Sequence, residues 1–137
     1  MRTLTLLIAT LFLCGCAAQS PVTGEPPATR AKVTALLTQA LPPGAGTEAR
    51  LLTVEYPPGG STPAHHHDGA IFAYVAEGAV VTALDDGPER RFEAGQSWYE
   101  RPGQVHRVSR NASTTRPAKL VVFFVTQPGS PPLRMEK

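Results

Sequence analysis

The sequence has almost no excess charge, few cysteines and no long hydrophobic run. Its 137 residues include 13 basic and 11 acidic side chains, and the net charge of +2 gives no electrostatic case for binding nucleic acid. The two cysteines, Cys14 and Cys16, both lie near the first residue. No disulfide can therefore form within the chain beyond residue 16, and the stability of this part must come from a packed core or from a bound metal.

The longest apolar run near the start, Leu4 to Leu13, is shorter than the roughly 20 residues that a membrane-spanning helix needs. With Arg2 before it, the run is typical of a secretory signal peptide. The end of the run, Leu13-Cys14-Gly15-Cys16, resembles the signal of bacterial lipoproteins, which predicts a signal peptide over 1–15 and lipidation of Cys16. The alternative is an ordinary signal peptide cleaved near Ala17-Ala18.

A lipidated Cys16 implies an exported protein that its acyl chains anchor in the membrane of the cell envelope. Ala17, rather than an aspartate, after the cysteine resembles lipoproteins sent to the outer membrane. In a diderm host we therefore expect the periplasmic face of that membrane. Residues 16–28 include three prolines and few apolar side chains, which predicts an extended flexible tether between membrane and domain.

The segment 29–45 has apolar residues at helical spacing. They are Val33, Leu36, Leu37, Ala40 and Leu41, and the pattern stops at Pro42-Pro43-Gly44. This spacing predicts one short amphipathic helix packed on the following domain.

Beyond residue 46 the chain has short β-rich runs separated by turn residues every eight to twelve positions, which is typical of a sandwich or barrel. Alternating or continuous apolar residues predict strands near 51–56, 71–76, 80–84, 90–93 and 119–126. Residues 46–127 are therefore expected to form a single all-β domain, and residues 128–137 a frayed tail.

Three of the four histidines are consecutive, at His65, His66 and His67, and the fourth is His106. On a strand, residues two apart point to the same face, about 6.6 Å apart along it. The alternation therefore predicts that His65 and His67 converge on one ion while His66 faces away. A solvated polar loop is the alternative for this cluster taken alone.

The surroundings of these histidines resemble the two motifs of the cupin family. Gly60, His65, His67 and Gly78 fit the first motif, with Gly60 one residue closer than usual, and Gly95, Gly103 and His106 fit the second. The resemblance implies a single cupin jelly-roll β-barrel with its metal inside, held by His65, His67 and His106. Glycines at the motif positions would permit tight turns with positive φ.

The sequence departs from the first motif at Ile71, which occupies the position of the family's glutamate ligand. The remaining three-histidine site is similar to that of some cupin-type dioxygenases and implies a divalent transition metal: iron, zinc, manganese, nickel or copper. Without a carboxylate the ion keeps its 2+ charge and should favour anionic or enolisable ligands. Asp68 and Glu100 are carboxylates near the site in sequence, and Asp68 is expected to point away.

Three functions stay open at this point. The first is a metal-dependent enzyme that acts on a small molecule by oxygen activation or Lewis-acid chemistry. The second is a non-catalytic module that binds a small molecule or a metal. The third is a structural or partner-binding domain with an empty barrel. For the site itself, the alternative is that Ile71 marks a decayed site whose histidines merely line a pocket, and a homodimer is expected by resemblance only. Aromatic residues in the predicted strands are expected to be core rather than substrate contacts, although by alternation half of each run faces inward and could line the cavity: Phe72, Tyr74, Trp98, Tyr99, Phe123 and Phe124.

Overall fold

The computed structural model describes residues 30–42 and 47–137. Within them every regular element is a β-strand, and no helix is long and apolar enough to cross a bilayer. The all-β prediction is confirmed. The predicted signal peptide, Cys16 and the tether lie outside the described residues.

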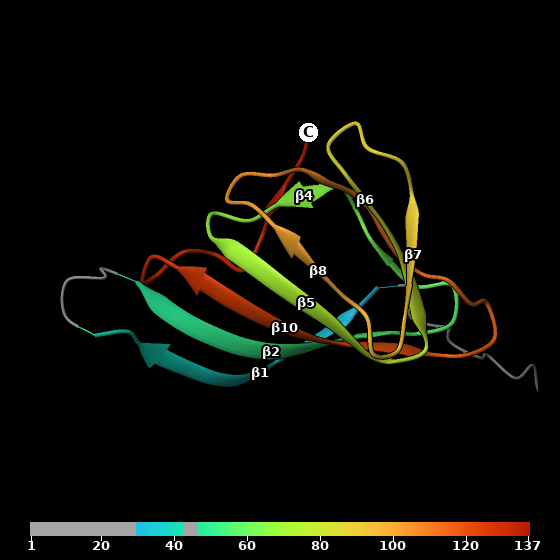
Figure 1. Ribbon diagram of the computed structural model, residues 1–137, viewed down its shortest axis with the longest axis horizontal. Helices are drawn as coiled ribbons and strands as arrows, with labels where there is room; N and C mark the ends of the chain where they lie inside the picture. Colours follow the sequence, from blue (N-terminus) through green and yellow to red (C-terminus); the bar gives the residue numbers. More distant parts are fainter. Residues whose placement is uncertain (1–29, 43–46) are drawn as a thin grey trace, which may run out of the picture.

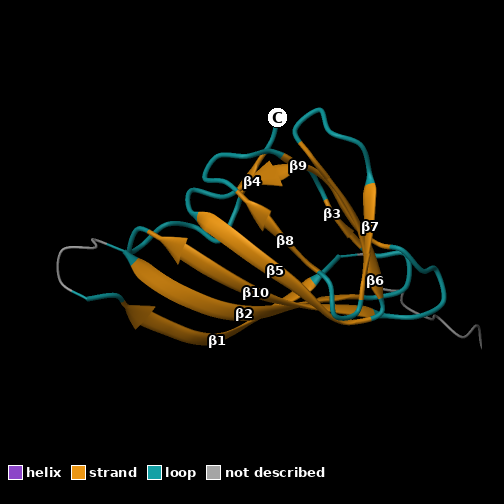
Figure 2. Cartoon of the chain, viewed as in Figure 1, coloured by secondary structure: helices purple, strands orange, loops and turns teal. Residues whose placement is uncertain are grey.

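Two antiparallel sheets face each other (Figures 1 and 2). The first contains, in spatial order, β1 (Lys32–Ala40), β2 (Glu48–Tyr56), β10 (Ala118–Thr126), β5 (Ala70–Glu77) and β8 (Ser97–Glu100). The second contains β11 (Arg134–Met135), β4 (His65–His66), β9 (His106–Asn111), β6 (Ala79–Leu84) and β7 (Arg90–Glu93), with β3 (Ser61–Thr62) paired to β9. Neighbours in space are mostly distant in sequence, as in a jelly roll.

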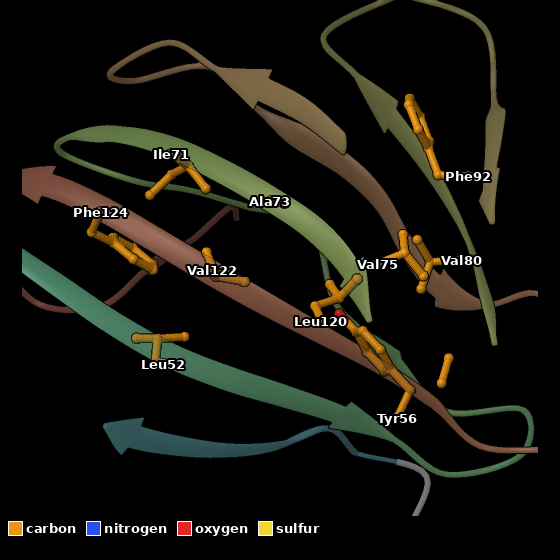
Figure 3. Close-up of a cluster of buried hydrophobic side chains, with 11 residues drawn as sticks. Leu52, Tyr56, Ile71, Ala73, Val75, Val80, Phe92, Leu120, Val122 and Phe124 are labelled. Carbon is orange, nitrogen blue, oxygen red and sulfur yellow. The ribbon is translucent and has the colours of Figure 1, made fainter. Parts of the chain in front are cut away.

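The core lies between the sheets. Alternating residues of β2, β5 and β10 point inward, where Leu52, Ile71, Val122 and Phe124 pack together (Figure 3). Alternation is clearest in β10, where buried and less buried residues follow one another along the whole strand. This is the expected pattern for a strand with one face on a core.

Three of the four motif glycines, all except Gly60, occupy the positive-φ conformations expected at tight turns. Gly78, Gly95 and Gly103 have φ angles of 71°, 92° and 71°, which side-chain-bearing residues rarely adopt. Gly78 is also confined by its surroundings, because a Cβ atom there would lie 2.6 Å from the carbonyl oxygen of Pro117.

The predicted helix over 29–45 is wrong for the described part of this segment. Residues 32–40 form the edge strand β1, which pairs with β2 and has an irregularity between Ala35 and Leu37. A bulge shifts the alternation of side chains along a strand, so apolar residues three or four apart also suit a bulged strand. All nine residues of β1 are exposed, so the helical spacing of its apolar residues does not reflect burial of one face against a core.

The C-terminal residues 128–137 are not a frayed tail. Arg134 and Met135 form β11 and pair with His66 and His65 of β4. The Arg134 guanidinium donates to both carboxylate oxygens of Asp68 at 2.8 to 3.0 Å, and the pKa of Asp68 is lowered by this contact. These contacts hold the segment against the strand that carries the histidines.

Candidate metal centre

His65, His67 and His106 come together at one end of the space between the sheets. His65 in β4 is the register partner of His106, the first residue of β9. Each of the three offers one ring nitrogen, and these atoms all lie within 4.8 Å of one another. The three residues are buried, at 4%, 8% and 4% exposure, whereas His66 is partly exposed and contacts Glu136. The predicted alternation of the three consecutive histidines is confirmed.

Backbone carbonyls set the orientation of two of the rings. The Nδ1–H of His65 donates to the Pro63 oxygen at 2.7 Å, and that of His67 donates to the Pro132 oxygen at 2.6 Å. A carbonyl oxygen only accepts, so each bond places the proton on Nδ1 and leaves the Nε2 lone pair free. This is the form in which an imidazole binds a metal, with its second nitrogen held by an outer partner.

The third ring, that of His106, is held by Thr82 on β6, the neighbouring strand of the same sheet. The Nε2 of His106 lies 2.5 Å from the Thr82 hydroxyl on β6, a hydrogen bond that either group could donate. Its Nδ1 lies 3.2 Å from Oε1 of Glu100. When Nε2–H donates to Thr82, the Nδ1 lone pair of His106 remains free to bind an ion.

Burial keeps two of the histidines neutral. It is the largest cause that lowers the pKa of His65 from 6.5 to about 4 and that lowers the pKa of His67. The carbonyl of Pro63 opposes this shift at His65 but does not offset it. Near pH 7 both rings are therefore deprotonated at one nitrogen, as metal binding requires.

Ile71 supplies no polar atom to the site, because its side chain is a hydrocarbon. This side chain is 1% exposed and belongs to the core. Its register partner on β8 is Glu100, which is itself 2% exposed. The Trp98 indole donates to Oε1 of Glu100 at 2.8 Å, while Oε2 has no hydrogen-bond partner in the part of the chain that the structure describes. Burial raises the pKa of Glu100, but the neighbouring His106, Trp98 and His67 outweigh it, and the net direction is downward.

A small, largely apolar cavity of about 70 Å³ adjoins the histidines. The first sheet contributes apolar walls that include Leu52, Ile71, Trp98 and Val122, and the second sheet contributes His65 and His106. Pro132 and Leu133 of the C-terminal segment also line it. This volume exceeds the roughly 10–15 Å³ that one water needs on the same measure, so the cavity has room for a compact ligand of a few heavy atoms.

Most of the aromatic side chains lie elsewhere. Phe124 and Trp98 line the cavity, as core or cavity positions should. Phe72, Tyr74, Tyr99 and Phe123 are 40–49% exposed on the outer face of the first sheet, so these four are not core, while the expectation that half of each run faces inward is confirmed. They occupy the outward positions of strands whose alternate residues are buried.

Sequence reasoning named Glu100 only as a carboxylate near the site in sequence, and it missed the hydroxyl of Thr82 and the carbonyls of Pro63 and Pro132. Alternation in β8 groups Glu100 with Trp98 on one face, and this signal was available. No local pattern indicates that β8 lies beside Ile71 or that residue 132 returns to His67, because both contacts join distant parts of the chain.

Solved structures with similar folds include enzymes and proteins without a stated activity. A Klebsiella pneumoniae protein described as an uncharacterized conserved protein with a double-stranded beta-helix domain has 19% identity and a TM-score of 0.61, over 87% of this chain and 100% of that one. An oxalate oxidase in complex with glycolate has 26% identity and a TM-score of 0.61, over 79% of this chain. The DMSP lyase DddQ from Ruegeria pomeroyi has 20% identity and a TM-score of 0.57, over 64% of this chain. This chain spans only 56% of the oxidase and 42% of the lyase.

Among curated proteins, none matches this chain. The family model described as cupin domain matches residues 52–124, a segment that contains all three buried histidines and exceeds half of the chain. With two facing antiparallel sheets around these histidines, the chain belongs to the cupin family.

Proposed function

We propose that His65, His67 and His106 bind a divalent transition metal, and that the bound metal acts on a small molecule in the adjoining cavity. The observation that carries this proposal is the convergence of three buried imidazoles, two of them fixed by backbone carbonyls with Nε2 free. Imidazole nitrogens suit iron, zinc, manganese, nickel and copper. When bound, such an ion supplies Lewis-acid chemistry or oxygen activation at positions that the protein leaves open.

The protein's own residues would position the ligand in an apolar cavity. Pro63, Pro132 and Thr82 hold the rings, so the donor nitrogens need little rearrangement on metal binding. The cavity walls are mostly apolar, and Pro132 and Leu133 of the C-terminal segment form part of them. Apolar walls lower the local dielectric constant, which would strengthen electrostatic attraction between the ion and an anionic ligand.

A catalytic role is favoured by the oxalate oxidase and the DMSP lyase among the similar structures, since both are named for reactions. A binding role without catalysis is the second candidate, because the cavity walls are mostly apolar and offer few acid or base groups. Oxygen uptake by the metal-loaded protein with thiols, diketones and phenols separates these roles. Turnover of any of them supports the enzyme, and tight binding without turnover supports the second candidate.

Metal content per chain after anaerobic purification tests the site itself. We expect about one ion in the wild type and clearly less in His65→Ala, His67→Ala and His106→Ala, because each change removes one of the three buried imidazoles. His66→Ala is the matched control and should keep the metal, since this ring points away.

Thermal melting gives an independent test. A ligand at a hundred times its Kd stabilises the folded state by about 2.7 kcal/mol, so a chelator should lower the Tm of the wild type and not of the His65→Ala variant. A wild-type melting curve that ignores the chelator, with no metal found, would favour the empty barrel instead.

We also propose that the protein is exported and anchored in the cell envelope through a lipidated Cys16. This part rests on the resemblance of Leu13-Cys14-Gly15-Cys16 to lipoprotein signals. Acyl chains stabilise membrane attachment by about 0.8 kcal/mol per buried methylene, so several chains on one cysteine would hold the domain firmly.

A further inference from the structure

We propose that Glu100, on β8, is a fourth ligand of this metal. The inference rests on the proposed three-histidine site and adds to it a carboxylate that comes from a different strand than Ile71. Three observations carry it: an unpartnered buried carboxylate oxygen, the distance from each carboxylate oxygen to one histidine, and the register between β5 and β8.

Among the residues that the structure describes, Glu100 is buried with no lysine or arginine beside it. The residue is 2% exposed, and its only ion-pair partners within 4.0 Å among residues 30–42 and 47–137 are His67 and His106. Its Oε2 atom has no hydrogen-bond partner in the same residues. Buried carboxylates are normally hydrogen-bonded, paired or bound to a metal, and a divalent ion would provide the positive charge that Oε2 lacks.

The distances match those between atoms that share one ion. Ligand atoms about 2.0–2.2 Å from a metal lie roughly 2.8–3.6 Å apart in octahedral or tetrahedral geometry. Oε2 of Glu100 lies 3.7 Å from Nε2 of His67, and Oε1 lies 3.2 Å from Nδ1 of His106. A shift of a few tenths of an ångström would bring the carboxylate and both rings into one coordination sphere.

The sheet explains how the carboxylate reaches this place. Glu100 and Ile71 are register partners on adjacent antiparallel strands, so their side chains lie on the same face of the sheet. The Trp98 indole donates to Oε1 and leaves Oε2 on the side of His67, which makes Trp98 a positioning residue. With Glu100 bound, the centre carries one net positive charge rather than two.

The test is a Co²⁺ titration of the wild type and of Glu100→Gln, with affinity measured by competition with a chelator. Glutamine keeps the size of the side chain and an oxygen for Trp98, but it lacks the charge. We expect at least about a tenfold loss of Co²⁺ affinity together with a changed visible spectrum of the bound ion. Glu93→Gln is the matched control, because Glu93 is exposed on β7 and pairs with Arg91, and it should change neither.

A relocated carboxylate provides the rescue. In Ile71→Glu combined with Glu100→Gln, the charge moves to the register partner, and we expect most of the lost affinity to return. If Glu100→Gln binds Co²⁺ as the wild type does, with the same spectrum, while His65→Ala does not bind, only the role of Glu100 is refuted. If the wild type itself binds no more Co²⁺ than His65→Ala, the three-histidine site fails as well.

A crystal structure of the Zn²⁺-loaded wild type decides the matter should Glu100→Gln not fold. A Zn–O distance of about 2.0–2.2 Å to a Glu100 oxygen supports the proposal. A carboxylate that stays beyond 3 Å from the bound ion, roughly one hydrogen-bond length away, overturns it.

Discussion

Acid should destabilise the metal-free protein through His65. The ring is 4% exposed, and burial lowers its pKa from 6.5 in the unfolded chain to about 4 in the folded protein. Between these two values the unfolded chain binds a proton that the folded chain does not. The free energy of unfolding therefore falls as the pH drops from 6.5 towards 4. Above pH 6.5 the contribution of His65 to this free energy is nearly constant.

The size of this effect follows from the two pKa values. At about 1.4 kcal/mol per pH unit, a change from pH 7 to pH 5 removes about 2 kcal/mol, and the full difference is about 3 kcal/mol near pH 4. For a domain of this size, 2 kcal/mol corresponds to a Tm that is roughly 8–16 °C lower. His67, whose pKa is lowered for the same reason, adds to the loss. The lowered pKa values of Asp68 and Asp85 act only below their ordinary value of 3.8, outside the range from pH 7 to 5.

The assay is urea unfolding in the presence of a chelator at pH 7 and pH 5. The His65→Asn variant cannot titrate at this position, so its loss between the two pH values should be about 2 kcal/mol smaller than that of the wild type. His66→Ala, a change at a partly exposed ring, serves as the control. Equal losses in the wild type and His65→Asn, or an NMR titration that places the pKa of His65 near 6.5, would refute this reasoning.

Three further predictions address the anchor, the C-terminal segment and one turn. Labelling cells with a radioactive fatty acid should mark the wild type and not Cys16→Ser, and equal labelling would exclude lipidation at this residue. Deletion of Pro132–Lys137 removes the carbonyl that holds His67, and calorimetric titration should show about 10–100-fold weaker metal binding, whereas unchanged affinity would make the segment dispensable. Gly78→Ala combines a φ of 71° with a Cβ contact of 2.6 Å to a backbone oxygen, and Gly59→Ala has a similar φ of 69° with open space. Urea unfolding should therefore find Gly78→Ala destabilised by more than the roughly 1 kcal/mol expected of Gly59→Ala. Equal losses would show that the backbone moves enough to remove the clash between the new Cβ atom and the Pro117 oxygen.

The edge strand β1 shows the limit of reasoning from spacing alone. Leu36, Leu37 and Ala40 have helical spacing, but β2 offers a strand edge along which residues 32–40 pair, and this pairing satisfies the backbone groups on one side of β1. A short helix in the same place would also be marginal on its own. The choice between helix and strand here is made by the neighbouring strand, which the local pattern does not include.

Residues close in sequence were placed correctly because strand geometry relates them directly. Alternation alone separates His66 from His65 and His67, and the motif spacing brings His106 to the same site in the structure. The positive φ of Gly78 likewise follows from a local property, since only glycine adopts it without strain. The sequence by itself thus determined the all-β class, the inward histidines and the turns.

Only the tertiary structure decided what surrounds those histidines. The pairing of β5 with β8 puts Glu100 opposite Ile71, and the return of the C-terminal segment brings the Pro132 carbonyl to His67. Both contacts join segments separated by dozens of residues, and they depend on which strands become neighbours in the jelly roll. Short-range periodicity carries no information on that pairing, because many pairings bury the same alternating faces equally well.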